Sequence, residues 1–244
     1  MSRGLFITGS DTGTGKTMVT AGIVRWLRKR GVDAVPMKPV QTGGEMQGGR
    51  LVAPDLEFSL SASGIQPVGD ELQAMAPYVY APACSPHLAG RMAGRYPDPC
   101  RIKECAEVLL QNHSVVVVEG AGGVMTPLNE DLTMLDLMRT LAYPVVLVSR
   151  SRLGAISHTL LAIHALRSSG MKLVGVVFDS VDQHQPDDRF IEEDNPKAVA
   201  RFGDVRVLGT VRHFDKMDPR NEQTWVAFEQ DMTGLENIYR ELAL

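Results

Sequence analysis

Three runs of aliphatic residues constrain the fold of this chain more than any other feature of its sequence. They are Val115–Val118, Val145–Val148 and Leu173–Val177, and each is a continuous apolar stretch rich in β-branched residues. Continuous runs of this length are typical of strands that are buried on both faces, as in a parallel sheet covered by helices. The sequence therefore predicts an α/β fold with a mainly parallel sheet.

Strand and helix patterns alternate along the rest of the chain. The other predicted elements are strands at residues 5–8, 34–37 and 206–208 and helices at residues 18–30, 132–141, 156–168 and 223–242. Such alternation is typical of a doubly wound α/β domain. We find no composition break or internal repeat, so residues 1–244 are predicted to form a single domain. Residues 41–50, which contain four glycines, and the acidic stretch 182–196 are interpreted as loops.

The charge balance excludes several classes of function. The chain has 25 Lys and Arg against 29 Asp and Glu, a formal net charge of −4, and no basic block. We therefore expect it to bind neither nucleic-acid backbone nor an anionic membrane. Backbone N–H groups can still hold a small anion without net positive charge. The longest apolar runs are too short to span a bilayer, and no signal peptide precedes the first strand.

The cysteines indicate the compartment. Cys84, Cys100 and Cys105 match neither an even disulfide framework nor a zinc-ligand spacing. Cys100 and Cys105 are interpreted as buried or half-buried thiols in a reducing compartment. We therefore expect a cytoplasmic protein.

The clearest chemical signal is the segment Gly9–Thr17, which reads GSDTGTGKT between a predicted strand and a predicted helix. Its glycines allow backbone N–H groups to turn towards phosphate oxygens, and the helix start adds partial positive charge. Lys16 would contact the β- and γ-phosphates, and the Thr17 hydroxyl would coordinate Mg²⁺. Ser10 stands where the strict pattern has its first glycine, so a Gly/Thr-rich turn before an amphipathic helix is the alternative. The flanking strand and helix favour phosphate binding and the P-loop NTPase fold.

Further motifs follow this phosphate loop in an informative order. They are KPVQTG from Lys38 to Gly43, Asp55, Pro77-Tyr78, Ser85-Pro86-His87, EGAGG from Glu119 to Gly123, and LGAISH from Leu153 to His158. Together with the phosphate loop, they resemble the dethiobiotin synthetase family. The resemblance extends from Gly9 to about Gly209.

The resemblance implies a reaction. In this family 7,8-diaminopelargonic acid is carboxylated with CO₂ and closed to dethiobiotin, with ATP as co-substrate and Mg²⁺ as cofactor. The reaction passes through a carbamate and a carbamic-phosphoric anhydride. Carbamate and γ-phosphate are both anionic and must be held within bonding distance. By resemblance, Lys16 and Lys38 neutralise them, and Thr12 places a hydroxyl beside the reacting groups.

The resemblance also implies the binding residues. Mg²⁺ would be held by the hard oxygens of Thr17, Asp55 and Glu119. The nucleotide would contact Gly13, Thr14, Gly15, Lys16, Thr17, Glu119, Gly120, Ala121, Gly122 and Asp179. The diamine substrate would contact Thr42 and, through a helix start that faces its carboxylate, Leu153, Gly154, Ala155 and Ser157. In the family this last segment comes from the neighbouring subunit, so a homodimer with active sites at the interface is expected.

Simpler interpretations of the same residues stay open. Lys38 is also typical of a solvated lysine at a strand end, Glu119 of a side chain that caps a turn, and Asp55 of a helix N-cap. His87 and His158 are interpreted as structural residues that pack or cap helices.

Two positions depart from the family pattern. Asp179 stands where the family commonly has an asparagine that hydrogen-bonds the adenine edge, and an ionised carboxylate can only accept hydrogen bonds. Arg212 replaces the proline of a Gly-x-Ile-Pro pattern. We therefore predict relaxed nucleotide selectivity, with ATP as the default.

Other classes of protein share this type of loop. Glutamine-dependent amide-forming synthetases carry a glutaminase domain with a nucleophilic cysteine, and we expect no such domain in residues 1–244. ParA/MinD-like nucleotide switches typically carry a second lysine early in the loop, where this chain has Ser10 and Asp11. A paralogue that only binds nucleotide would not need Lys38 and Asp55 beside the phosphate loop.

Overall fold

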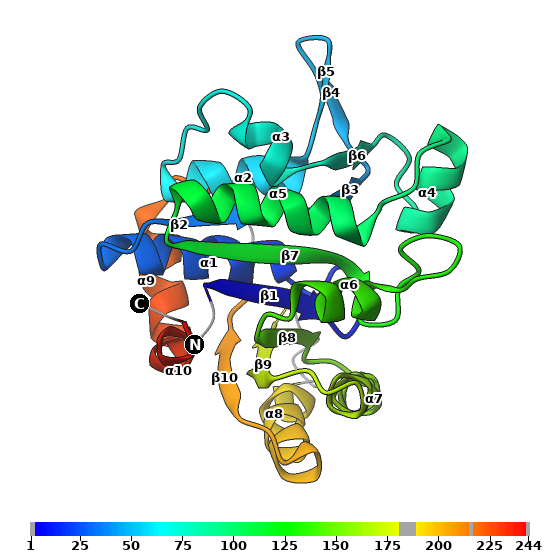
Figure 1. The fold of residues 1–244 in the computed structure, drawn as a ribbon. Coiled ribbons are helices and arrows are strands. Elements are labelled where there is room, and N and C mark those ends of the chain that lie inside the picture. Colours follow the sequence, from blue (N-terminus) through cyan, green and yellow to red (C-terminus); the bar gives the residue numbers. More distant parts are fainter. Residues whose placement is uncertain (1–2, 181–188, 215–216, 243–244) are drawn as a thin grey trace.

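A six-stranded parallel sheet forms the centre of the molecule in the computed structural model, which describes residues 3–180, 189–214 and 217–242 (Figure 1). The strand order is β10-β9-β8-β1-β7-β2. The strands are β1 Gly4–Gly9, β2 Ala34–Met37, β7 Val115–Gly123, β8 Val145–Arg150, β9 Leu173–Asp179 and β10 Val207–Val211. All six predicted strands are found, and the predicted doubly wound α/β fold is confirmed.

Helices cover both faces of this sheet. Successive residues of a strand point to opposite sides, so each strand packs against both layers of helices. In β1, Leu5 and Ile7 pack into one apolar cluster and Phe6 packs into the other. The first cluster includes α1 Lys16–Lys29, α9 Glu222–Asp231 and α10 Leu235–Glu241. The second includes α5 Pro99–Asn112, α6 Met134–Leu141, α7 Ala155–Ser168 and α8 Arg189–Gly203 (Figure 1). This burial on two sides explains the continuous apolar runs of the strands.

The predicted helices at 18–30, 132–141 and 156–168 correspond to α1, α6 and α7, with ends shifted by at most two residues. The single helix predicted at 223–242 is wrong, because α9 and α10 are separate elements. The backbone N–H of Gly234 donates to the Leu208 carbonyl at 2.7 Å. A Cβ on Gly234 would lie 2.6 Å from the Leu208 side chain. The chain therefore leaves the helix at Gly234 to pack directly on β10.

Residues 41–50, interpreted as a loop, instead contain short strands. β3 Val40–Thr42 pairs with β6 Tyr78–Tyr80, and β4 Glu45–Gln47 forms a hairpin with β5 Arg50–Val52. The hairpin projects at the top of Figure 1. Its two-residue turn is Gly48-Gly49, with φ of 56° and 81°, the left-handed conformation that matches the twist of paired strands. The glycines thus mark a tight hairpin turn.

The loop predicted at 182–196 is wrong for residues 189–196, which belong to α8. Residues 182–188 lie outside the described residues. Pro196 stands inside α8 and has no N–H to donate to the carbonyl of Glu192, four residues earlier. The Ser151 hydroxyl donates to that carbonyl instead, at 3.1 Å. A tertiary contact therefore replaces the hydrogen bond that the proline removes.

The remaining helices are α2 Pro54–Ser63, α3 Glu71–Met75 and α4 Pro86–Ala93. Neither α3 nor α5 is predicted from the sequence. At the start of α5, Asp98 accepts a hydrogen bond from the Cys100 N–H at 2.9 Å. Cys105 is buried as expected, but Cys100 is exposed, because it lies in the first turn of α5 on the side away from the sheet. The prediction of a buried or half-buried thiol is wrong for Cys100.

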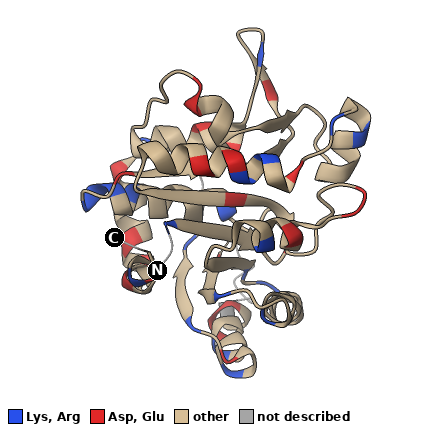
Figure 2. Cartoon of the chain, viewed as in Figure 1, with Lys and Arg blue, Asp and Glu red and all other residues tan. Residues whose placement is uncertain are grey.

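The phosphate loop follows β1, at the point where the order of strand addition reverses. From β1 the chain first builds towards β2 and later returns to β8 on the other side, and ligands of open α/β sheets bind at such switch points. Charges of both signs are spread over the helices and loops, and the sheet is largely free of them (Figure 2). No helix among the described residues is long and apolar enough to span a membrane.

Candidate active site

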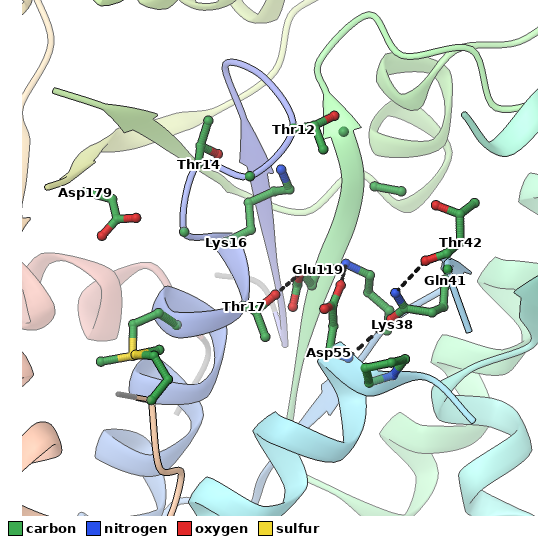
Figure 3. A pocket seen from close by; sticks show the side chains of 18 of the residues that line it. Thr12, Thr14, Lys16, Thr17, Lys38, Gln41, Thr42, Asp55, Glu119 and Asp179 are labelled. Carbon is green, nitrogen blue, oxygen red and sulfur yellow. Dashed lines mark hydrogen bonds and ion pairs between the residues drawn. The ribbon is translucent and has the colours of Figure 1, made fainter. Parts of the chain in front are cut away.

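A cavity of about 610 Å³ lies at the carboxyl ends of the sheet strands, around the phosphate loop (Figure 3). The predicted site residues that line it are Thr12, Gly13, Thr14, Gly15, Lys16, Thr17, Lys38, Thr42, Asp55, Glu119, Ala121, Gly122 and Asp179. They come from α1, α2, β3, β7, β9 and the connections that follow β1 and β2. The fold therefore gathers residues that are far apart in the sequence at one place.

The phosphate loop has a left-handed backbone at two glycines. The φ angles of Gly13 and Gly15 are 66° and 84°, which side chains with a Cβ rarely adopt. Gly15 immediately precedes α1, whose first N–H groups are left without helical partners. A Cβ on Gly15 would lie 2.2 Å from a carboxylate oxygen of Asp179. Both the backbone angle and the close approach of Asp179 therefore require glycine at position 15.

Lys16 is a buried cation at this loop. Its Nζ donates to the backbone carbonyl of Asp11 at 2.9 Å. Burial, followed by repulsion from the Lys38 ammonium, lowers the pKa of Lys16 to about 8, although three nearby carboxylates oppose the change. Two ammonium groups thus share one cavity, and an anion between them would stabilise both.

Lys38 lies between two carboxylates. Its Nζ is 2.6 Å from Asp55 Oδ2 and 2.6 Å from Glu119 Oε1 (Figure 3). The same Glu119 oxygen accepts a hydrogen bond from Thr17 Oγ1 at 2.8 Å. The side chains of Lys38 and Glu119 are only 6% and 3% exposed. Lys38 is therefore not a solvated lysine, and the cluster joins α1, α2, β7 and the end of β2.

The charge state of the cluster follows from its geometry. Burial disfavours the Lys38 ammonium, but attraction to Glu119 and Asp55 outweighs burial and raises the pKa of Lys38. Burial also raises the pKa of the Glu119 carboxyl, and the ammonium opposes that rise. Lys38 is thus charged at neutral pH and balances one of its two carboxylate neighbours. The Lys16 ammonium also lies within the field of Glu119 and Asp55, so the two lysines and the two carboxylates balance in formal charge.

The oxygens of Thr17, Asp55 and Glu119 fit Mg²⁺ completed by phosphate and water. Hydroxyl and carboxylate are hard ligands, and Mg²⁺ at nucleotide sites is held by one or two protein carboxylates plus phosphate oxygens. Among the residues that the structure describes, no three His, Cys, Asp or Glu side chains could hold a metal together.

Asp179 lies at the other end of the cavity from Lys38 (Figure 3). Burial raises its pKa from the ordinary 3.8 to about 7, and the positive charge of Arg150 works against this rise. Arg150 is the neighbour of Asp179 across β8 and β9, and its Nε donates to the Gly13 carbonyl at 2.6 Å. The two side chains therefore contact the phosphate loop from adjacent strand ends.

The Asp179 end of the cavity also has apolar lining that sequence reasoning missed. Met18, Phe214 and Met217 line the cavity, as does Arg212, which follows the β10 residue paired with Asp179. The Arg212 guanidinium binds both oxygens of Asp231, at 2.8 and 2.6 Å, so its charge is neutralised within the protein. Phe214 and Met217 are single apolar residues in a polar segment and carry no periodic signal, which is why they were not predicted.

Gln41 and Glu45 line the Lys38 end and were also missed. Gln41 is buried, and its side-chain oxygen lies 3.4 Å from the backbone N–H of Asp55, at the start of α2. Asp55 is the second residue of that helix, and Ala53 is the N-cap, so the N-cap interpretation of Asp55 is wrong. Gln41 thus contacts the helix start that presents Asp55 to the cavity.

Some predicted site residues do not line the cavity. Gly120 is part of the β7 backbone, where a Cβ would lie 2.9 Å from Phe6. The helix start predicted near Gly154 is found, with Gly154 as the N-cap of α7 and Leu153 84% exposed. However, Leu153, Gly154, Ala155 and Ser157 lie outside this chain's cavity. His158 is exposed and lines a separate cavity, and His87 lies in the first turn of α4.

Comparison with known proteins assigns the chain to a family. A family model described as an AAA domain matches residues 3–221. The ATP-dependent dethiobiotin synthetase BioD of Anaeromyxobacter dehalogenans (strain 2CP-C) is 42% identical over 181 residues, which cover 72% of this chain and 76% of that protein. The protein of the same name from Halalkalibacterium halodurans is 35% identical, covering 86% and 84%. The one from Aromatoleum aromaticum is 36% identical, covering 89% and 93%.

The chain belongs to the dethiobiotin synthetase family. Membership of this family confirms the predicted class of enzyme, an ATP-dependent ligase of biotin synthesis.

Solved structures show how widely the fold of a dethiobiotin synthetase is shared. The cell-division ATPase MinD of Pyrococcus furiosus superposes with a TM-score of 0.56 at 18% identity, covering 98% of this chain and 99% of that one. A ParA family ATPase from Chlorobium tepidum gives a TM-score of 0.53 at 11% identity, covering 99% and 97%. At these identities the likeness concerns the fold alone, so the predicted P-loop fold is confirmed and a switch function is not implied.

Proposed function

We propose that this chain converts 7,8-diaminopelargonic acid, CO₂ and ATP into dethiobiotin, ADP and phosphate. One amine nitrogen attacks CO₂, so that a C–N bond forms and the nitrogen loses a proton. A carbamate oxygen then attacks the γ-phosphorus, and the bond to ADP breaks. The second amine attacks the carbamoyl carbon, which closes the ureido ring and releases inorganic phosphate.

The observation that carries this proposal is the pair of buried ammonium groups of Lys16 and Lys38 in one cavity. The second step brings two anions, the carbamate and the γ-phosphate, into bonding contact, and preorganised cations lower the cost of that approach. Lys16 would hold the phosphoryl oxygens from the phosphate loop. Lys38 would hold the carbamate from the opposite side, and the Thr12 hydroxyl would hydrogen-bond the reacting groups.

Mg²⁺ is the proposed cofactor, held by Thr17, Asp55 and Glu119 with phosphate oxygens. When bound, it neutralises charge on the phosphates as the anhydride forms. Lys38 is hydrogen-bonded to Asp55 and Glu119, two of the proposed Mg²⁺ ligands. The ammonium group that would contact the carbamate therefore lies beside the residues that would hold Mg²⁺ on the phosphates. This adjacency supports a shared site for both anions.

ATP is the proposed co-substrate, with its phosphates at Gly13–Thr17 and along Glu119–Gly122. The base would lie at the other end of the cavity, where Met18 and Phe214 offer apolar surface and Asp179 offers a polar group. Asp179 stands where the family commonly has an amide that both donates and accepts. Unlike that amide, it loses its donor when it ionises, so we propose that nucleotide selectivity is relaxed. Turnover with ATP, CTP and GTP at limiting concentrations tests this, and a strong preference for ATP would contradict it.

The tail of the diamine is proposed to extend from Thr42 towards a second subunit, whose Leu153–Ser157 segment would bind the substrate carboxylate. Two observations support this arrangement. The segment forms the start of α7, whose positive dipole end suits a carboxylate although the Ala155 N–H already donates to the Arg152 carbonyl at 3.0 Å, and it lies outside its own chain's cavity. We therefore propose a cytoplasmic homodimer that acts on small molecules and binds neither nucleic acid nor membrane.

The activity is tested by incubating the chain with the diamine, bicarbonate, ATP and Mg²⁺ and detecting dethiobiotin by mass spectrometry. EDTA should abolish product, and excess Mg²⁺ should restore it. A preparation that binds nucleotide by calorimetry but forms no dethiobiotin contradicts the proposal.

The shared site is tested by mixing two inactive variants, Lys38→Met and Ser157→Asp. A mixed dimer places both changes in one of its sites and leaves the other intact, so mixing should restore activity. Each variant incubated alone is the control. No gain on mixing, in a preparation shown by mass spectrometry to contain mixed dimers, contradicts a site built from two subunits.

A further inference from the structure

Ser10, the residue that replaces the first glycine of the strict phosphate-loop pattern, begins a chain of hydroxyl groups. Its Oγ lies 3.0 Å from Ser149 Oγ on β8. Ser149 Oγ lies 2.6 Å from Thr159 Oγ1 on α7, and Thr159 Oγ1 donates to the Ala155 carbonyl at 2.6 Å. Ser149 and Thr159 are fully buried. The chain therefore joins the phosphate loop to the first turn of α7.

The direction of the hydrogen bonds follows from the number of protons available. A hydroxyl donates one hydrogen bond and accepts two. Thr159 uses its proton on the Ala155 carbonyl, so it must accept from Ser149. Ser149 has then used its own proton and must accept from Ser10. All donors point from the phosphate loop towards α7, an arrangement in which successive bonds strengthen one another.

Other contacts fix the two ends of this chain. The backbone N–H of Ser10 donates to the Val148 carbonyl at 2.9 Å, so the loop is tied to β8 at two points. On the other side, Asn195 of α8 donates to the Arg152 carbonyl at 3.0 Å, just before α7. The hydroxyl chain is thus held between two anchored segments.

We propose that Ser10, Ser149 and Thr159 form a positioning relay, through which nucleotide binding at the phosphate loop orders the first turn of α7. A glycine at position 10 would satisfy the strict loop pattern but would remove the first donor of the relay. The purpose of the ordering rests on the proposed function, since that turn would bind the carboxylate of the substrate held by the partner subunit. The relay itself requires only nucleotide binding.

Hydrogen exchange of the α7 amides, with and without a non-hydrolysable ATP analogue and Mg²⁺, tests the relay. In the native chain we expect the analogue to slow exchange in residues 155–159. Thr159→Val keeps the shape of the side chain and removes the hydroxyl, so the slowing should fall by roughly fivefold or more, as expected for loss of a buried hydrogen bond. Thr159→Ser keeps the hydroxyl and should retain the slowing. Analogue binding is measured for each variant by calorimetry.

Ser149→Ala breaks the relay at its centre and provides a second variant if Thr159→Val does not fold. If the hydroxyl had only a structural role, the substitution would change the α7 exchange rates equally with and without the analogue. The relay instead predicts that the substitution reduces the slowing that the analogue causes. Equal slowing in the native chain and in either relay variant overturns the proposal, as does the absence of slowing in a native chain saturated with analogue. Failure of the dethiobiotin assay would leave these measurements unaffected.

Discussion

Replacement of Asp179 by asparagine tests whether burial or attraction to Arg150 governs the pKa of this carboxyl group. In the folded chain burial raises the pKa of Asp179 to about 7 from the ordinary 3.8, and Arg150 opposes the shift. The native state therefore binds a proton that the unfolded state releases between about pH 4 and pH 7. Stability is highest below this range, falls as the pH rises through it, and reaches a constant penalty above it.

The size of the penalty follows from the shift. One pKa unit corresponds to about 1.4 kcal/mol, so a shift of about three units gives a penalty of about 4 kcal/mol at pH 8.5. At pH 4.5 most of the carboxyl is still protonated in the folded state, and the same relation gives about 1 kcal/mol. Asp179→Asn removes the charge and should therefore stabilise the chain by about 3 kcal/mol more at pH 8.5 than at pH 4.5.

Urea denaturation of both proteins at the two pH values measures this difference. Asp131→Asn, at an exposed turn position, is the matched control and should change stability by less than about 0.5 kcal/mol at either pH. If attraction to Arg150 outweighed burial, Asp179→Asn would instead destabilise the chain at pH 8.5. That result, or an equal gain at both pH values, would refute the reasoning.

Two further predictions concern the phosphate loop and the lysine cluster. Lys38→Met should reduce dethiobiotin formation by about 10²-fold or more while nucleotide binding persists in calorimetry, and it should destabilise the chain by about 3–5 kcal/mol because Glu119 is left buried and unpaired. Adding Glu119→Gln should recover stability in urea denaturation but not activity; recovered activity would exclude a direct role for Lys38. Gly15→Ala should abolish nucleotide binding, because its φ is 84° and its Cβ would overlap Asp179. Gly31→Ala, with φ of 79° and open space around the Cβ, is the matched control and should cost about 1 kcal/mol of stability with binding unchanged.

The fold was predictable where local pattern and burial agree. The strands of the sheet carry continuous apolar runs because helices cover both faces, and this property is visible in the sequence itself. The β4–β5 hairpin and the 15-residue helix α8 were missed because no such local pattern marks them. The β4–β5 hairpin is exposed and short, so it has no apolar alternation, and α8 contains Pro196, whose cost is offset by a hydroxyl from a distant strand end.

The candidate site divides in a similar way. The phosphate loop is a contiguous motif, so its residues could be named without a structure. Lys38, Asp55 and Glu119 could be named only through resemblance, because nothing in their spacing places them together. Phe214 and Met217 could not be named at all, since they reach the cavity only through the path of the chain after β10.

The sequence by itself determined the α/β class, the six strands and a phosphate loop between a strand and a helix, because each depends on neighbours within a few residues. Only the tertiary structure decided that one ammonium group lies 2.6 Å from two carboxylates, that Asp179 packs against Gly15, and that Ser10 is hydrogen-bonded towards α7. Each of these depends on contact between segments that are far apart in the chain. Such contacts set burial and charge, and burial and charge set the chemistry of the site.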